Sequence, residues 1–197
     1  MTRTQRIIDL RPEDGERVGQ AAALLVEAFK EHWPGAWPDL DAALVEVHES
    51  FGPDRISRVA VDESGRVLGW VGGIRQYDGH VWELHPLAVS PACRGRGVGR
   101  ALVADLEALV AGRGGLTLWV GTDDEDGQTS LAGADLYPDA LGRLAAIRNL
   151  RGHPFEFYQR LGFALVGVMP DANGPGKPDI FLAKRVGERT GRDDGDA

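Results

Sequence analysis

The feature that most constrains the fold of this chain is a run of glycine and arginine, residues 94–100, which closely follows a strand-like segment, residues 81–89. Apolar residues recur at helical spacing within and behind the run: Val98, Ala101, Leu102, Leu106 and Leu109. A glycine-rich turn between a strand and a helix favours an anion, because main-chain N–H groups and the helix dipole point at the same place. Glycine also lets the backbone approach a phosphate without a Cβ in the way. We therefore expect an α/β chain that binds a pyrophosphate at this run.

The spacing of the glycines separates this run from two common phosphate-binding motifs. The dinucleotide fingerprint needs G-x-G-x-x-G with an acid about 20 residues later, and the Walker loop ends in Gly-Lys-Ser/Thr. Neither pattern is present at the run. It reads instead as Arg-x-x-Gly-x-Gly, with Arg94, Gly97 and Gly99 in the fixed positions. The alternative interpretation is a tight strand-to-helix connection that carries surface arginines.

Length and composition predict one globular domain, residues 1–187, followed by a polar, disordered tail, residues 188–197. The chain has 197 residues, 43% of them hydrophobic, with neither an apolar stretch near the ~20 residues of a membrane span nor a secretory signal. Its one cysteine, Cys93, excludes an internal disulfide framework, so we expect a cytoplasmic protein. Cys93 has no evident histidine partner, and we interpret it as a spacer. The net charge of −8 argues against nucleic acid and favours a cationic substrate.

The pattern along the chain predicts an α/β fold, a mixed central β-sheet flanked by helices. Strands are expected at residues 7–10, 56–62, 66–77, 81–89, 116–120, 163–169 and 180–186. Helices are expected at residues 11–29, 39–51, 97–111 and 155–161. This order, β-α-α-β-β-β-α-β-α-β-β, is typical of an α/β sandwich around one sheet.

A candidate catalytic group lies on the strand before the glycine run. Alternate residues of a strand share a face, so Glu83, His85 and Leu87 are expected to point the same way. Pro86 has no N–H and interrupts the ladder, which can leave the Leu87 N–H free to point at a ligand. A carboxylate can hold an ammonium group, an imidazole or water can take a proton, and a main-chain N–H can stabilise an oxyanion. The alternative is that Glu83 and His85 are ordinary, partly exposed strand residues.

Tyr158 is a candidate proton donor. It lies in an aromatic, helix-like segment, residues 155–161, just before a Leu-Gly-Phe turn. A phenol with a pKa of about 10 can donate a proton to a leaving group. The alternative is a core tyrosine whose hydroxyl group is satisfied within the protein.

An aromatic and acidic group predicts a binding surface for a cationic substrate. Its aromatic members are Trp33, Trp37 and Tyr77, and its acids, residues 123–126, follow a strand. Carboxylates at the carboxyl edge of a sheet lie where ligands usually bind, and aromatic rings can cover apolar rings or contact a cation. The alternative is a solvated acidic loop. The five histidines are scattered and Cys93 is alone, so no metal site is expected.

Taken together, the sequence resembles the aminoglycoside 6′-N-acetyltransferases, a family within the GNAT superfamily of N-acetyltransferases. The glycine and arginine run resembles the acyl-coenzyme A pyrophosphate loop of that superfamily. The matching segments, spread from about residue 24 to residue 186, are Trp33-Pro34, Gln76-Tyr77, residues 82–87, 121–124, 135–137, 149–151, 153–154, 156–158, 161–162, 166–168, 172–174 and 177–180.

The resemblance implies a GNAT fold and direct transfer of acetyl from acetyl-coenzyme A to the 6′-amine of a cationic aminoglycoside, by a homodimer, without metal or a covalent acyl-enzyme. By position, Glu83 would orient the 6′-ammonium, His85 would assist its deprotonation, and the Leu87 N–H would hold the thioester oxygen. Tyr158 would be the proton donor near the thiol. The residues implied in coenzyme binding are Leu87, Ala88, Val89, Arg94, Gly95, Arg96, Gly97, Val98, Gly99, Arg100 and Asn149. Those implied on the antibiotic side are Trp33, Trp37, Tyr77, Glu83, Asp123 and Asp124.

Two other functions remain open at this point. The acceptor could be a polyamine, another small amine or a protein N-terminus, which an acceptor screen would separate from an antibiotic. The chain could also be a non-catalytic acyl-coenzyme A-binding protein on the same fold, although the joint presence of Glu83, His85 and Tyr158 favours catalysis.

Overall fold

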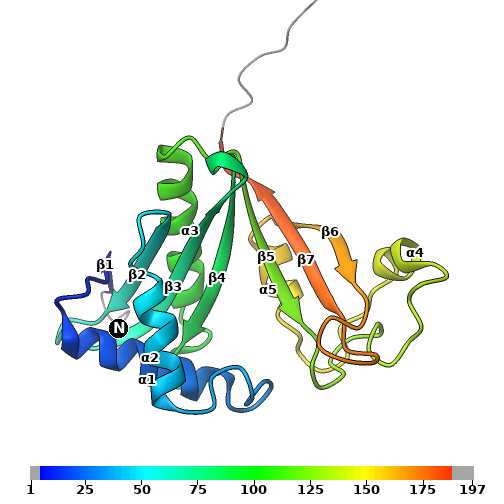
Figure 1. The fold of residues 1–197 in the computed structure, drawn as a ribbon, viewed down its shortest axis with the longest axis horizontal. Helices are drawn as coiled ribbons and strands as arrows, with labels where there is room; N and C mark the ends of the chain where they lie inside the picture. The colour runs from blue at the N-terminus through cyan, green and yellow to red at the C-terminus, as the bar shows by residue number, and fades with distance from the viewer. Residues whose placement is uncertain (1–4, 188–197) are drawn as a thin grey trace, which may run out of the picture.

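The computed structural model describes residues 5–187, and the tail predicted to be disordered, residues 188–197, lies outside the described residues. One mixed sheet runs through the molecule in the strand order β1-β2-β3-β4-β5-β7-β6 (Figure 1). The strands are β1 (Arg6–Asp9), β2 (Arg55–Val61), β3 (Val67–Gln76), β4 (Val81–Val89), β5 (Thr117–Asp123), β6 (Ala164–Met169) and β7 (Asp179–Arg185). The helices are α1 (Gly15–Phe29), α2 (Leu40–Glu49), α3 (Val98–Gly112), α4 (Ala140–Ala145) and α5 (Phe155–Arg160), with short 3₁₀ turns η1 (Tyr77–Gly79) and η2 (Pro91–Cys93). The predicted α/β architecture is therefore confirmed.

Two helix predictions differ from the structure. The first helix begins at Gly15 rather than at residue 11, because the Asp14 carboxylate caps it by accepting a hydrogen bond from the Arg17 N–H (3.3 Å). The sequence pattern did not reveal α4, a helix of six residues in which only Leu144 is buried. A single buried position produces no repeating apolar stripe, so no helical period could be detected there.

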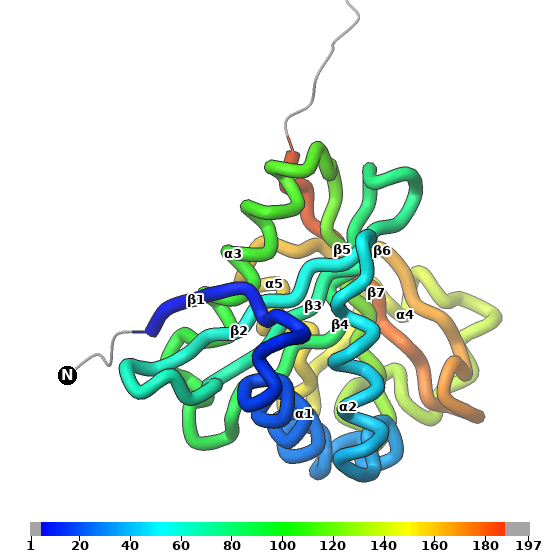
Figure 2. The backbone as a smooth tube through the Cα atoms, turned by 60° about the vertical axis from the view of Figure 1, so that its left-hand side comes forward, coloured from blue at the N-terminus to red at the C-terminus, as the bar shows by residue number. Residues whose placement is uncertain are grey.

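Apolar clusters cover both faces of the β2–β4 part of the sheet. On one face, α1 and α2 pack over Val59, Trp70 and Ala88, all of them buried. On the other face, Leu84 and Leu102 belong to the larger cluster, to which α3 and α5 contribute. Figure 2 shows α1 and α2 together on one side of these strands. On their face of the sheet, α1 and α2 pack over the strands up to β4 and leave those beyond β4 uncovered.

The strands β4 and β5 separate soon after they begin. They form a parallel pair only at Val81–Glu83 and Thr117–Trp119. Beyond these residues the strands diverge, and Figure 1 shows the sheet opening like a V toward their carboxyl ends. The edge of β4 from Leu84 onward therefore faces a gap in the sheet. Such a break at the carboxyl ends of parallel strands is where α/β proteins usually bind ligands.

A bulge in β4 changes which side chains share a face. The β3–β4 register shifts opposite Gly72, where an added Cβ would lie 2.2 Å from the His85 carbonyl oxygen. A one-residue shift exchanges the two faces of a strand. Both strand neighbours of Glu83, Trp82 and Leu84, belong to the larger apolar cluster, so the Glu83 side chain points to the other face of the sheet. The Leu87 side chain, by contrast, packs against that same cluster. The prediction that Leu87 points the same way as Glu83 and His85 is therefore wrong.

Candidate active site

The N-terminus of α3 is open to a ligand. Its N-cap residue, Gly97, has a left-handed φ of +85°, and no side chain caps the helix. By contrast, an aspartate carboxylate caps each of α1, α2 and α4: Asp14, Asp39 and Asp139. The first N–H groups of a helix have no partner within it, so those of α3 are available to an anion. A Cβ built on Gly97 would meet no atom within 4 Å, which leaves room for a phosphate.

Arginines surround this open helix end, and a glycine holds it close to the gap. Arg94, Arg96 and Arg100 are exposed, and Arg94 Nη2 donates to the Ala28 carbonyl oxygen near the end of α1 (3.0 Å). A Cβ built on Gly99 would lie 3.3 Å from Phe157 Cζ on α5 and 3.5 Å from a methyl carbon at the end of β4. The glycine at this position therefore lets α3 begin directly against β4 and α5.

Two main-chain N–H groups near the end of β4 point into the gap. The Ser90 N–H donates to a carbonyl oxygen beside β3 (2.9 Å). Successive N–H groups of a strand point to opposite edges, so the Ala88 N–H also faces β3, and those of Leu87 and Val89 face away from it. The Ala88 carbonyl oxygen lies on the β3 side as well, 3.0 Å from an ideal Cβ on Gly69. Leu87 and Val89 thus present N–H groups to a ligand, whereas the main chain of Ala88, expected to bind coenzyme, is engaged with β3.

A chain of hydrogen bonds from β5 to β4 fixes Glu83. Trp119 Nε1 donates to Gln76 Oε1 (3.0 Å), and Gln76 Nε2 donates to Glu83 Oε2 (2.7 Å). Burial raises the pKa of Glu83, although His85 and the hydrogen bond from Gln76 lower it. Gln76 is a positioning residue for this carboxylate. An amide at the end of a strand has no distinguishing signal in the sequence, so this role emerges only from the structure.

His85 lies between α2 and the loop that follows α1. Its Nε2 is 3.7 Å from Glu46 Oε1 on α2, and its ring centroid is 6.1 Å from that of Trp37. Trp37 is buried, with its ring centroid 4.7 Å from that of Phe29 and 6.4 Å from that of Trp33. Trp37, with Trp33 packed against it, therefore lies beside His85. The sequence pattern missed Glu46, because a carboxylate on a helix surface looks like any solvated residue.

Asp123 ends β5 with a half-buried carboxylate on the same face as Trp119. It accepts a hydrogen bond from Asn173 Nδ2; burial raises the pKa of Asp123, and the bond from Asn173 lowers it.

His153 supports the main chain of Asp123. The Phe155 N–H donates to His153 Nδ1 (3.2 Å), so Nε2 carries the proton and donates to the Asp123 carbonyl oxygen (3.1 Å). Burial lowers the pKa of His153, which favours the neutral ring.

Asp124, expected on the antibiotic side, is buried inside the loop that follows β5. It is 0% exposed, and its carboxylate accepts hydrogen bonds from the Gln128 N–H (2.6 Å), the Thr129 N–H (2.8 Å) and Thr129 Oγ1 (2.7 Å). The loop curls back over this carboxylate, which leaves no oxygen directed at a substrate. The structure therefore gives Asp124 a role in shaping the loop in place of the expected contact.

Three further candidate residues have different surroundings. Tyr158 is buried on α5 with its ring 5.0 Å from that of Phe157, and burial raises its pKa, so the phenol stays protonated. Tyr77, expected on the antibiotic side, is 75% exposed in η1, just before the part of β4 that pairs with β5. The side-chain oxygen of Asn149 accepts hydrogen bonds from two N–H groups of the turn before α5 (both 2.8 Å). Tyr158 lies beside the open end of α3 through Phe157, and the Asn149 side chain holds the turn before α5.

His32 connects the two sides of the gap. Its Nδ1 lies 3.0 Å from Asp126 Oδ2 and 3.0 Å from Gln128 Nε2. The loop after α1 therefore contacts the loop after β5 at the open end of the V (Figure 1). As a result, the two tryptophans and the acids that follow β5 lie around one opening.

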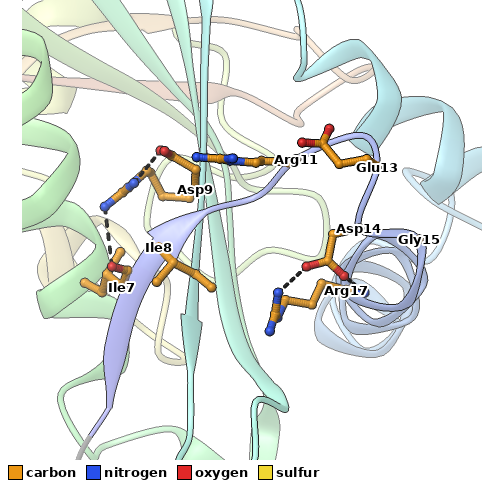
Figure 3. A pocket seen from close by; sticks show the side chains of 9 residues that line it. Ile7, Ile8, Asp9, Arg11, Glu13, Asp14, Gly15 and Arg17 are labelled. Carbon is orange, nitrogen blue, oxygen red and sulfur yellow. Dashed lines mark hydrogen bonds and ion pairs between the residues drawn. The ribbon is translucent and has the colours of Figure 1, made fainter.

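A separate cavity of about 740 Å³ lies at the β1 edge of the sheet, beside the start of α1 (Figure 3). Charges of both signs line it, and several of them pair with one another: Arg17 with Asp14, and Arg58 with Asp9. Two strands, β2 and β3, separate β1 from β4. This cavity is therefore not part of the candidate active site.

The groups gathered around the gap are carboxylates, an imidazole, a phenol and main-chain N–H groups. Such groups hold cations, transfer protons and bind anions. None of the helices in the described part of the chain has the length and apolar character that crossing a membrane requires. Across residues 5–187, no set of three or more His, Cys, Asp or Glu side chains is arranged to hold a metal ion.

Comparison with known proteins points to one family. Residues 13–132 match the model of the acetyltransferase (GNAT) family. The chain is similar to a solved structure of an aminoglycoside 6′-N-acetyltransferase complexed with coenzyme A, at 40% identity and a TM-score of 0.85 over 94% of this chain and 99% of that one. It is also similar to the aminoglycoside 6′-N-acetyltransferase from Enterococcus faecium, at 40% identity and a TM-score of 0.83 over the same shares, 94% and 99%.

Curated relatives give a shorter match. An acetyltransferase of Photorhabdus laumondii subsp. laumondii is 36% identical over 81 residues, which is 41% of this chain and 52% of that protein. The chain spans 39% and 52% of the lengths of two curated relatives that it matches.

Proposed function

This chain belongs to the GNAT family of acetyltransferases, and on that basis we propose that it transfers acetyl from acetyl-coenzyme A to the 6′-amine of aminoglycoside antibiotics. Its 40% identity to two aminoglycoside 6′-N-acetyltransferases supports this acceptor. The observation that carries the proposal is the meeting of three features at the gap in the sheet. These are the uncapped N-terminus of α3, the edge of β4 with its free N–H groups, and the partly buried carboxylate of Glu83.

The open end of α3 fits the pyrophosphate of coenzyme A. The N–H groups of residues 97–100 would bind phosphate oxygens, and the arginines around them would add positive charge. The Val89 N–H would pair with the pantetheine arm in the gap beside β4. When bound, acetyl-coenzyme A supplies an acetyl group activated as a thioester. The Leu87 N–H would donate a hydrogen bond to the thioester oxygen.

The acidic side of the gap suits an amine that is charged in solution. An alkyl amine has a pKa of about 10.4, so it arrives as an ammonium, which the Glu83 carboxylate would hold. His85, directly or through a water molecule, would accept the proton that the amine must lose. Tyr158 would donate a proton to the sulfur that leaves. Trp33 and Trp37 would cover the sugar rings, and Asp123 would face other ammonium groups of the antibiotic.

The test is an assay of the purified protein with acetyl-coenzyme A and kanamycin or tobramycin, in which thiol release is followed and the product is located by NMR. We expect thiol release and an acetyl group on the 6′-nitrogen. An aminoglycoside with a 6′-hydroxyl is the matched negative substrate. No turnover across several 6′-amino aminoglycosides would contradict the proposal. Turnover of a polyamine or small amine instead would identify another acceptor, and coenzyme binding without any transfer would indicate a binding protein.

Glu83→Gln should lower kcat/KM for the aminoglycoside by about 100-fold, because an amide cannot hold an ammonium by charge. The pH profile makes the test specific. Because burial raises the pKa of Glu83, the wild-type kcat/KM should fall as the pH drops through that raised pKa, and the variant should lack this limb. Glu49→Gln, which removes an exposed carboxylate at the end of α2, is the control and should match the wild type.

Tyr158→Phe should lower kcat by about tenfold with little change in the KM of either substrate, since it removes only the proton donor. The rings of Phe157 and Phe163, 5.0 Å and 5.6 Å away, would still pack against the new side chain, so the thermal midpoint should be preserved. Single-turnover kinetics separate chemistry from product release. A single-turnover rate equal to that of the wild type would show that another group protonates the sulfur.

The family resemblance also supports a homodimer, and the single cysteine favours a cytoplasmic location. Light scattering of the purified protein should then give a mass of two 21.2 kDa chains. A mass of one chain would overturn this part of the proposal.

A further inference from the structure

We propose that His32 is a positioning residue for the acceptor. It links the tryptophan loop, residues 30–38 between α1 and α2, to the β5 loop, residues 124–130. Through this link it holds the tryptophan side of the site in the position in which the acceptor binds. The inference rests on the proposed function and deepens it, because it assigns a residue that acts on the affinity for the acceptor and not on the transfer of acetyl.

A single side chain makes the link between the two loops. His32 Nδ1 lies 3.0 Å from Asp126 Oδ2 and 3.0 Å from Gln128 Nε2. Within residues 5–187, no other hydrogen bond joins the tryptophan loop to the β5 loop. At its start the tryptophan loop is held locally, since the Trp33 N–H donates to the Phe29 carbonyl oxygen at the end of α1 (2.9 Å). The link across the gap therefore depends on His32.

The β5 loop is the anchored side of this link. Gln128 is 4% exposed, and its N–H donates to the buried carboxylate of Asp124 (2.6 Å). The Gln128 carbonyl oxygen accepts a hydrogen bond from the Leu150 N–H (2.8 Å). The Arg151 guanidinium donates to the main-chain carbonyl oxygen of Asp126. His32 therefore attaches the tryptophan loop to a segment whose own position is fixed from within the protein.

The imidazole keeps a bond to the β5 loop in either of its forms at Nδ1. A ring nitrogen carries a hydrogen or a lone pair, not both. With a hydrogen, Nδ1 donates to Asp126 Oδ2; with a lone pair, it accepts from Gln128 Nε2. The acids beside the ring are Asp126 and Glu31, whose Oε2 lies 3.8 Å from His32 Nε2. A change of tautomer therefore exchanges one partner on the β5 loop for the other, and the two loops stay linked.

Fixing His32 also fixes an aromatic ring at the opening of the site. Trp33 is the next residue in the chain and is only partly buried, whereas Trp37 is buried with its ring 4.7 Å from that of Phe29. The position of Trp37 is therefore set by the core, and that of Trp33 depends more on the loop. A sugar ring that packs on Trp33 binds more tightly when the loop is already ordered, because the acceptor then does not have to order it.

His32→Phe tests the inference, because the phenyl group keeps a ring of similar size and removes both nitrogens. The side chains of His32 and Asp126 are 47% and 40% exposed, and exposed pairs are weak. We therefore expect the KM of kanamycin to rise about fivefold, with kcat within twofold of the wild type and the dissociation constant of coenzyme A unchanged. His48→Phe, the same change at an exposed histidine of α2, should leave all three constants as in the wild type.

A conservative variant and a double variant distinguish the link from a merely structural effect. His32→Asn retains an amide near the position of Nδ1, which can donate to Asp126 or accept from Gln128, so the KM of kanamycin should stay within about twofold of the wild type. When His32→Phe is combined with Asp126→Ala, the rise in KM should be smaller than the product of the two single rises, because residues in contact are not additive.

Hydrogen exchange measures the link without any acceptor. In His32→Phe the main-chain N–H groups of residues 30–38 should exchange about fivefold faster than in the wild type, because the loop opens more often. Those of α3 should exchange at the wild-type rate. His48→Phe is again the control and should show no change in either segment.

The outcomes separate this inference from the proposed function. Unchanged exchange of residues 30–38 or an unchanged KM of kanamycin in His32→Phe would overturn the role of His32, while acetylation of kanamycin by the wild type stands. Weaker binding of coenzyme A in this variant would also overturn it, since the effect would then be general. Failure of the wild type to acetylate any 6′-amino aminoglycoside would instead overturn the proposed function, and the acceptor role of His32 with it.

Discussion

Gly97→Asp is expected to weaken the binding of coenzyme A by at least about 100-fold, equivalent to about 2.7 kcal/mol. The new carboxylate would lie at the N-terminus of α3, where no side chain now caps the helix. It would accept hydrogen bonds from the N–H groups that a phosphate needs, and its charge would repel the pyrophosphate. Isothermal titration calorimetry with coenzyme A measures the dissociation constant directly.

The matched control for this variant is Gly114→Asp. Gly114 has a φ of +80°, close to the +85° of Gly97, and a Cβ on either residue would meet no atom within 4 Å. Both variants therefore carry the same added charge and a similar backbone strain of ~1–2 kcal/mol. Gly114 follows the other end of α3, so its variant should bind coenzyme A like the wild type. Equal affinities for the two variants would refute the assignment of the α3 N-terminus as the pyrophosphate site.

Asp124→Ala is expected to destabilise the protein by about 3–5 kcal/mol, because it removes three hydrogen bonds to a buried carboxylate. Two of the donors are main-chain N–H groups, at Gln128 and Thr129, which would be left buried without a partner. For a chain of this length the thermal midpoint should fall by roughly 10 °C. Urea unfolding and differential scanning calorimetry measure the change.

Two further variants make this second prediction specific. Asp124→Asn keeps one acceptor oxygen and should recover part of the lost stability. Asp126→Ala, at a more exposed carboxylate of the same loop, should change the free energy of unfolding by less than about 1 kcal/mol. A loss below about 1 kcal/mol for Asp124→Ala would mean that the buried hydrogen bonds of Asp124 do not hold the loop.

Most of the sheet and the long helices could be predicted from the sequence, because their signals are local. The strand β4 was predicted with the bounds it has, since its apolar residues and the glycines that follow it define both ends. Helices α2 and α3 were predicted to within two residues at each end. In α3 the buried positions Val98, Leu102 and Leu106 recur at the helical period, which sequence alone displays.

The site was only partly predictable, because several roles depend on contacts between distant segments. The Leu87 side chain points to the opposite face from the one predicted, because β4 has a bulge opposite Gly72. No residue of β4 predicts that bulge. Asp124 and Asp123 are neighbours in sequence, yet one organises a loop and the other faces the gap. Gln76 acquires its role from a partner on the neighbouring strand, Glu83.

The sequence by itself determined the strand, the glycine-rich turn and the start of α3, because backbone conformation and an uncapped helix end depend on residues close together in the chain. Only the tertiary structure decided which carboxylates lie around the gap, since burial, strand register and the divergence of β4 from β5 arise when segments far apart pack together. A carboxylate has the same chemistry in every sequence; its pKa and its partners are set by what is folded against it.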